Sequence, residues 1–161
     1  MERFLNYQPV AWEQIPDFGL YMDQVITYVE KQLAPLYGET AGKLLTPAMI
    51  NNYVKIGLLP RPQGKKYDRA QLALMLMVAT LKQSASIEDV ARLVKIPEGS
   101  DMRAVYEAFA AAQNRIIRTV FEQAADEEAN AMRFAIEAST YRLACEVLLK
   151  GDQEIAEKAD V

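Results

Sequence analysis

The stretch that decides the fold is Thr46-Pro-Ala-Met-Ile-Asn-Asn-Tyr-Val-Lys-Ile-Gly-Leu-Leu-Pro-Arg-Pro-Gln-Gly-Lys-Lys-Tyr-Asp-Arg69. Thr46 can cap a helix, and Pro47 suits the first helical position because its missing N–H would have had no partner there. Apolar residues then recur at helical spacing as far as Val54, and Gly57 can adopt the left-handed conformation that ends a helix. The stretch therefore predicts a short helix with one face toward a core.

A basic loop follows this helix. Pro60 and Pro62 exclude helix, and Gly64 permits a tight turn, so residues 60–67 are expected to form an extended loop or hairpin. The loop carries the basic side chains Arg61, Lys65 and Lys66.

Further helices are predicted on both sides of this stretch. Residues 20–36 have an amphipathic pattern. Asp68 and Gln71 form a capping box that opens a helix, and residues 72–81 are nearly all apolar, so this helix should be buried and form the hub of the fold. A second capping box opens a helix over 87–94.

The two ends of the chain have different patterns. Residues 1–18 lack periodicity and are expected to form an extended arm that packs on the core through aromatic side chains. Residues 101–150 are helical in pattern, and we expect two antiparallel helices separated near residues 125–128, with Asp126 capping the second. One long helix is the alternative. The charged tail 151–161 is expected to fray.

Composition restricts the classes of function. Of 161 residues, 51% are hydrophobic and 25% charged, which suits a folded chain of one compact domain, or one small domain with a helical extension. There is no histidine and a single cysteine, Cys145, which we interpret as a small core residue. A Ser-His-Asp triad and a Cys/His zinc site are therefore excluded, and nucleotide-binding glycine motifs are missing. We expect no enzyme activity, cofactor or metal, although carboxylate pairs and a carboxylate-only magnesium or calcium site stay open.

The sequence also bears on location. No apolar run is long enough to span a membrane, and the N-terminus lacks the pattern of a signal peptide. We therefore expect a cytoplasmic protein with no membrane partner.

Charge is distributed unevenly along the chain. The net charge is −4, yet residues 43–82 contain seven basic side chains and one acidic one, which is 7 − 1 = +6. A positive segment in an acidic protein is typical of a surface that contacts phosphates. A solvated cationic loop without a ligand is the simpler alternative.

A family resemblance adds to this pattern. The run Ile50-Asn-Asn-Tyr53 to Gly57-Leu-Leu-Pro60, followed by basic residues and Lys66-Tyr-Asp68, resembles the MerR-like winged helix-turn-helix. In that family a recognition helix ends in an aromatic residue, a short spacer and Gly-Leu-Leu-Pro, and a wing ends near Arg/Lys-Tyr. The resemblance covers about residues 20–96 and also points to an uncharacterised bacterial family of regulators. The segment 36–45 is longer than the usual turn between the first two helices.

The resemblance implies a mainly helical, all-α fold with a small wing hairpin over 60–67 and a C-terminal helical hairpin or long helix. Its parts would be an N-terminal arm (1–19), a DNA-binding domain (20–97), a dimerisation or regulatory region (98–150) and a tail (151–161).

The implied function is transcriptional regulation through double-stranded DNA. The helix 47–56 would enter the major groove, where Asn51 and Asn52 can pair with adenine, and the wing would meet phosphates. Candidate DNA-binding residues are Thr46, Asn51, Asn52, Tyr53, Lys55, Arg61, Lys65 and Lys66. Tyr53 could equally be a core-edge residue, and Tyr67 is expected to close the wing against the core.

Partners follow from the same interpretation. One small helix and a wing bury little DNA, so a homodimer is expected, with the C-terminal helices as its surface. The alternative is that the apolar stripe of these helices folds back on the core of its own chain. An effector would be an organic molecule or a protein. The alternative hypothesis is a non-catalytic protein–protein interaction module that uses the winged helix and the acidic C-terminal helices.

Overall fold

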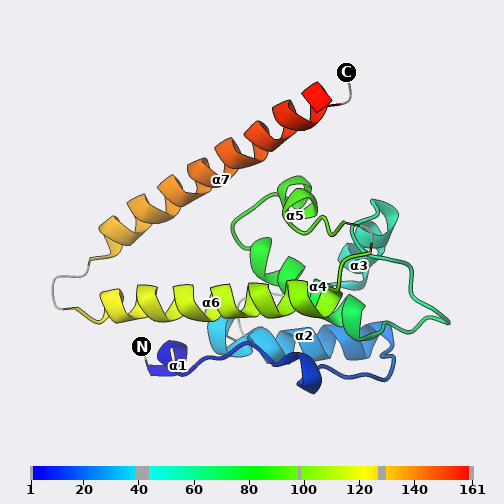
Figure 1. Ribbon diagram of the computed structural model, residues 1–161. Helices are drawn as coiled ribbons and strands as arrows, with labels where there is room; N and C mark the ends of the chain where they lie inside the picture. Colours follow the sequence, from blue (N-terminus) through cyan, green and yellow to red (C-terminus); the bar gives the residue numbers. More distant parts are fainter. Residues whose placement is uncertain (1, 39–43, 98, 127–129, 160–161) are drawn as a thin grey trace.

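The computed structural model describes residues 2–38, 44–97, 99–126 and 130–159. Within these ranges the chain is mainly helical, so the predicted all-α class is confirmed (Figure 1). The elements are α1 (Glu2–Leu5), the 3₁₀-helix η1 (Trp12–Gln14), α2 (Met22–Tyr37), α3 (Pro47–Lys55), α4 (Arg69–Leu81), α5 (Ile87–Leu93), α6 (Met102–Ala124) and α7 (Ala131–Ala159).

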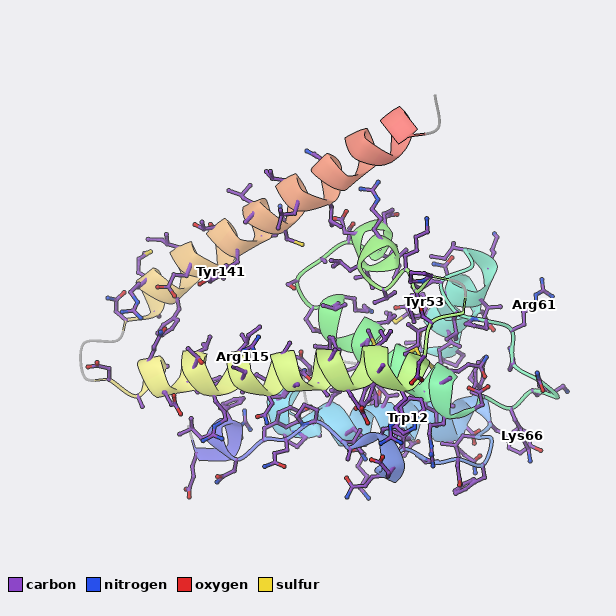
Figure 2. All side chains as sticks on the ribbon, viewed as in Figure 1. Trp12, Tyr53, Arg61, Lys66, Arg115 and Tyr141 are labelled. Atoms are coloured by element: carbon purple, nitrogen blue, oxygen red, sulfur yellow. The ribbon has the colours of Figure 1, made fainter. Side chains whose placement is uncertain are left out.

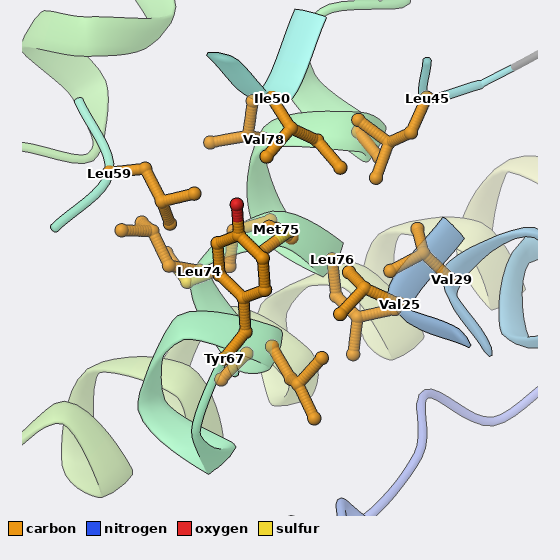
Figure 3. Packing of buried hydrophobic residues seen from close by; sticks show 14 of the residues in the cluster. Val25, Val29, Leu45, Ile50, Leu59, Tyr67, Leu74, Met75, Leu76 and Val78 are labelled. Carbon is orange, nitrogen blue, oxygen red and sulfur yellow. The ribbon is translucent and has the colours of Figure 1, made fainter. Parts of the chain in front are cut away.

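Helix α4 is the centre of the fold, as its nearly continuous apolar sequence predicts. Residues 71–79 are all buried, and α2 and α6 both pack against this helix. Its start is fixed by the predicted capping box, because the Gln71 N–H donates to Asp68 Oδ1 (2.9 Å) and the Asp68 N–H donates to Gln71 Oε1 (2.9 Å). Figure 3 shows the α4 side chains between Val25 and Val29 of α2 and Ile50 of α3.

Helix α3 forms for the local reasons that the sequence indicates. The Met49 N–H donates to Thr46 Oγ1 (3.2 Å), and Pro47 occupies the first turn, where a free N–H is not needed. Gly57 follows the helix with a φ of 76°, which is a conformation that glycine adopts without steric cost. The buried face of α3 is made by Ile50 and Tyr53.

The predicted wing hairpin is wrong, because no strand forms in the described ranges. Pro60 and Pro62 have no N–H to donate to a strand ladder, so the loop 60–67 cannot pair with itself along its length. Instead the Lys66 N–H donates to Gln63 O (2.9 Å) and closes one tight turn with positive φ at both central residues, 55° at Gly64 and 65° at Lys65. Such values are typical of a type I′ turn.

The basic loop is held by the segment that precedes α2. Leu20 and Tyr67 exchange two backbone hydrogen bonds of 3.0 and 2.9 Å, and both side chains are buried. Figure 3 shows that the ring of Tyr67 points into the core, as predicted for the residue that closes this loop. The loop is therefore anchored at its C-terminal end only a few residues from the start of α4.

The N-terminal arm is not extended throughout, because α1 and η1 interrupt it. These helices are four and three residues long, too short to produce a periodic pattern in the sequence. The expected aromatic packing is present: the ring of Phe4 stacks on that of Phe121 at 4.1 Å, and the Tyr106 hydroxyl donates to Val10 O (2.7 Å). The arm thus lies along α6.

Two C-terminal helices are present, as predicted, but their boundaries differ from the prediction. The Arg133 N–H donates to Asn130 Oδ1 (2.8 Å), so Asn130 rather than Asp126 caps α7. Residues 127–129 of the predicted interruption lie outside the described ranges. Helix α7 continues past Gly151 to Ala159 through a segment rich in Glu, Ala and Lys, which are good helix formers, and the predicted fraying of this tail stays a prediction.

Helix α7 projects away from the rest of the chain. Figure 1 shows α6 and α7 as the two arms of a V, with α7 passing α5 on its way to the C-terminus. Leu149 is buried, and α7 contacts α5, whereas many other apolar residues of α7 are exposed. The core of the protein accordingly lies between α2, α3, α4, α5 and the first half of α6.

Candidate nucleic-acid interface

The solvent-facing side of α3 is polar. Asn51, Asn52 and Lys55 are exposed, whereas Ile50 and Tyr53 point inward. The amides of Asn51 and Asn52 make no side-chain hydrogen bond to any residue that the structure describes. Both are therefore free to bind a ligand, and an amide offers a donor and an acceptor side by side.

The loop beside α3 adds positive charge. Arg61, Lys65 and Lys66 are exposed, and Figure 2 shows Arg61 and Lys66 at the end of the molecule where the loop projects beyond α3. Together with Lys55, they form no ion pair with a carboxylate in the described ranges. Uncompensated basic groups on one surface attract anions.

Lys66 is positioned by its surroundings. Its ammonium lies 5.1 Å from the centre of the Tyr21 ring, which favours a cation through its negative face. Its stem packs against Gly19, where an added Cβ would stand 2.8 Å from Lys66 Cβ. The segment before α2 therefore orients Lys66 as well as anchoring the loop.

Two grooves run along α3, one on each side. The first has a volume of about 490 Å³ and separates α3 from the start of α2 and the basic loop. Its lining residues are Tyr21, Met22, Asp23, Asn51, Val54, Pro62, Lys65 and Tyr67. The second, of about 390 Å³, separates α3 from the end of α4. Its lining residues are Ala48, Met49, Asn52, Tyr53, Lys82, Ala85 and Ile87. Asn51 and Asn52 thus face different grooves. The exposed side of α3 between the two grooves, with Asn51, Asn52 and Lys55, is called the ridge below.

Negative charge is sparse on these walls. Asp23 is the only acidic residue among the lining residues described for the two grooves. It lies in the first turn of α2, where the partial positive charge of a helix N-terminus stabilises a carboxylate. The ridge and its grooves are otherwise neutral or basic.

The positive segment 43–82 is not all on this surface. Arg69 turns toward the N-terminal arm, where its Nε donates to Ile15 O (2.8 Å) and a terminal nitrogen lies 3.7 Å from Asp17. Lys43 lies outside the described ranges. The interface therefore gathers Lys55, Arg61, Lys65, Lys66 and, on the far side of α3, Lys82.

Two of the candidate residues have structural roles. Tyr53 is only 4% exposed, and burial raises the pKa of its hydroxyl, so the core alternative for this residue is the one that the structure supports. The hydroxyl of Thr46 caps α3, and its side chain is half-buried. Neither side chain contributes to the exposed ridge.

Lys82 was missed as a site residue. It directly follows α4 in the sequence, yet it lines the second groove together with Asn52 of α3. Local sequence patterns do not reveal such a tertiary contact. The one available signal was its place within the basic segment.

Among the described residues no group of three acidic or cysteine side chains could hold a metal ion. In the same ranges no helix has the length and apolar character needed to cross a membrane.

Comparison with known proteins gives one match. The model of a family described as a domain of unknown function (DUF1836) matches residues 10–109, which is more than half of the chain. The matched region begins before η1 and ends within α6, so it contains the ridge, the grooves and the basic loop. No curated protein and no solved structure matches the chain.

Proposed function

The chain belongs to the DUF1836 family, and we propose that it binds double-stranded DNA as a transcriptional regulator. The observation that carries the proposal is the polar, carboxylate-poor ridge of α3 with the basic loop beside it. A nine-residue helix fits the major groove, which is about 12 Å wide in B-DNA. The sequence resemblance of the α3 segment to MerR-like regulators supports the same function, although the wing hairpin of that family does not form in the described ranges.

The exposed residues suit two kinds of contact. Asn51 and Asn52 can each form a bidentate pair with adenine N6 and N7, which would give sequence preference. Lys55, Arg61, Lys65 and Lys66 would bind phosphates, which fixes position but carries no sequence information. Tyr53 takes no part because its ring is buried.

Removing the two loop lysines should weaken binding to any duplex. In the variant Lys65→Ala/Lys66→Ala we expect lower affinity and a log–log salt slope that is shallower by about 1.8, since each lost phosphate contact changes it by about 0.9. Fluorescence anisotropy with random duplex DNA over a salt series measures both quantities.

The matched control is Lys31→Ala/Lys150→Ala, which removes the same charge at two exposed positions on α2 and α7. It should bind as the unchanged protein does. If both double variants lost the same amount of affinity for duplex DNA, net charge, and not the loop, would determine that affinity. Failure of the unchanged protein to bind duplex DNA at low salt would refute the proposed function.

Asn52 should determine sequence preference. In Asn52→Ala we expect a loss of discrimination of about 1–3 kcal/mol at one base pair, with little change in binding to random DNA. Selection of duplexes from a random pool, by the unchanged and variant proteins in parallel, measures this. Because Asn52 is exposed, the thermal unfolding midpoint of the Asn52→Ala variant should equal that of the unchanged protein. A lower midpoint would assign Asn52 a structural role instead.

We further propose that the regulator is a homodimer that pairs through α7. One side of α7 has an apolar stripe of residues that are strongly exposed: Met132 (71%), Ile136 (58%), Leu143 (58%) and Val147 (68%). The intervals along the stripe are four, seven and four residues, so the spacing is symmetric about the midpoint of the stripe. An antiparallel second copy would thus place Met132 against Val147 and Ile136 against Leu143, as a two-fold interface requires.

The interaction-module alternative also has a specific observation in its favour. Tyr141 (73%) and Leu148 (70%) are exposed on α7 outside this stripe. Large exposed apolar side chains of this kind mark protein contacts when they cluster. The DNA measurement above separates the two functions, because an interaction module does not require binding to duplex DNA.

A further inference from the structure

Lys82 lies on the opposite side of the α3 ridge from the basic loop. Lys65 lines the groove between α3 and the loop, whereas Lys82 lines the groove between α3 and the end of α4. Asn51 borders the first of these grooves and Asn52 the second. The ridge that would read bases therefore has a lysine on each flank.

The surroundings of Lys82 leave its charge unsatisfied. The side chain is half-buried, and its ammonium lies 3.3 Å from Met49 Sδ, which is a weak acceptor. No carboxylate in the described ranges forms an ion pair with it. Burial lowers the pKa of Lys82 below its ordinary value, because the charged form loses part of its hydration.

A partly desolvated charge without a partner lowers stability, so a residue that serves packing alone would be better uncharged. A methionine at residue 82 could occupy the same place beside Met49, because it has nearly the same length and no charge. Packing therefore does not explain why residue 82 carries an ammonium group. A positively charged group at the edge of a groove binds an anion.

The geometry of duplex DNA supplies such an anion. A helix in the major groove lies between the phosphates of the two strands, so contacts from its two sides reach different strands. On the basis of the proposed function, we propose that Lys82 binds a phosphate of the strand opposite the one that the basic loop contacts. The ridge would then be clamped between both backbones, which fixes the depth and tilt at which Asn51 and Asn52 meet the bases.

The variant Lys82→Met tests this proposal because it keeps the stem and removes the charge. We expect weaker binding to random duplex DNA and a salt slope shallower by about 0.9, as for one lost phosphate contact. Without DNA, the thermal unfolding midpoint should be unchanged or higher, because an unpaired, partly buried charge has been removed. Lys150→Met, at an exposed position on α7, is the matched control and should change neither quantity.

The strand assignment has its own measurement. Single phosphates of a selected duplex are replaced one at a time by neutral methylphosphonates, and binding is measured for the unchanged protein, Lys82→Met and Lys65→Ala. A replacement at a contacted phosphate should no longer weaken binding once its lysine is gone. We expect the phosphates assigned in this way to Lys82 and to Lys65 to lie on opposite strands.

Each contrary outcome is distinct. If the unchanged protein does not bind duplex DNA, the proposed function itself fails. If it binds and Lys82→Met binds equally well, only the role of Lys82 is refuted. A lower unfolding midpoint in Lys82→Met, or assignment of both lysines to one strand, would also overturn the proposal.

Discussion

Replacing Leu143 by glutamate should convert the proposed dimer into a monomer. Leu143 lies in the exposed stripe of α7, and an antiparallel partner would face it with Ile136. Glutamate there would be buried in the interface without a partner, and burial of an unpaired carboxylate is strongly unfavourable. Sedimentation equilibrium should give twice the mass of one chain for the unchanged protein and the mass of one chain for Leu143→Glu.

Loss of the dimer should also weaken binding to a duplex with two half-sites. When two modules are linked, the second binds as an intramolecular event, which raises the overall affinity by about 10²–10⁴. We expect Leu143→Glu to lose an effect of this size on a two-half-site duplex. Binding to a single half-site should change little, because α3 and its loop are distant from this stripe in the fold.

Leu148→Glu is the control for this experiment. Leu148 is 70% exposed, more than Leu143, and lies on the same helix outside the stripe, so the two variants differ in position and not in chemistry. It should remain a dimer. A monomeric unchanged protein would refute the dimer, and dissociation of both variants would show that the stripe is not the specific surface.

Truncation of Leu72 should produce a large loss of stability. Leu72 has no exposed surface and lies in the first half of α4, which the other core elements surround. Leu72→Ala removes buried atoms and leaves a cavity, and such changes cost about 2–5 kcal/mol of unfolding free energy. Since single domains have total stabilities of about 5–15 kcal/mol, this is a large fraction.

Guanidinium denaturation monitored by circular dichroism measures this loss. Leu93→Ala on α5 is the matched control, because Leu93 is 42% exposed and should lose much less than Leu72. We expect a lower midpoint with an unchanged slope for Leu72→Ala. Similar shifts in the two variants would mean that α4 is not the hub of the folded core.

The helix starts could be predicted because their determinants are local. Thr46, Asp68 and Ser86 each accept the backbone N–H three residues later, and the pattern of a polar cap before an apolar run is visible in the sequence. The burial of α4 was predictable for a similar reason, since a helix without a polar face must be surrounded.

The predicted hairpin did not form for physical reasons that local sequence patterns do not reveal. The loop 60–67 has the glycine of a hairpin, but its prolines prevent the strand pairing that would follow. Its stability comes from Leu20, which lies more than forty residues earlier in the chain. Helix α7 continues through Gly151 because one glycine costs only about 1 kcal/mol, which the good helix formers after it offset.

The site was predicted in part for the same reasons. Helical spacing was enough to place Asn51, Asn52 and Lys55 on the exposed side of α3. Spacing could not decide between the two roles of Tyr53, because the neighbours that bury it come from elsewhere in the chain. Lys82 lies at the end of α4 and shares a groove with α3, which is a property of the tertiary fold alone.

The contact between Gly19 and Lys66 couples two distant positions of the chain. Because an added Cβ at residue 19 would stand 2.8 Å from Lys66 Cβ, a larger residue there would push the basic loop away from the start of α2. A side chain at residue 19 is therefore compatible with the same loop position only if residue 66 is glycine, because every other residue keeps the Cβ that it would meet. A basic side chain at residue 66 thus requires glycine at residue 19 for this loop position, and the two positions should evolve together.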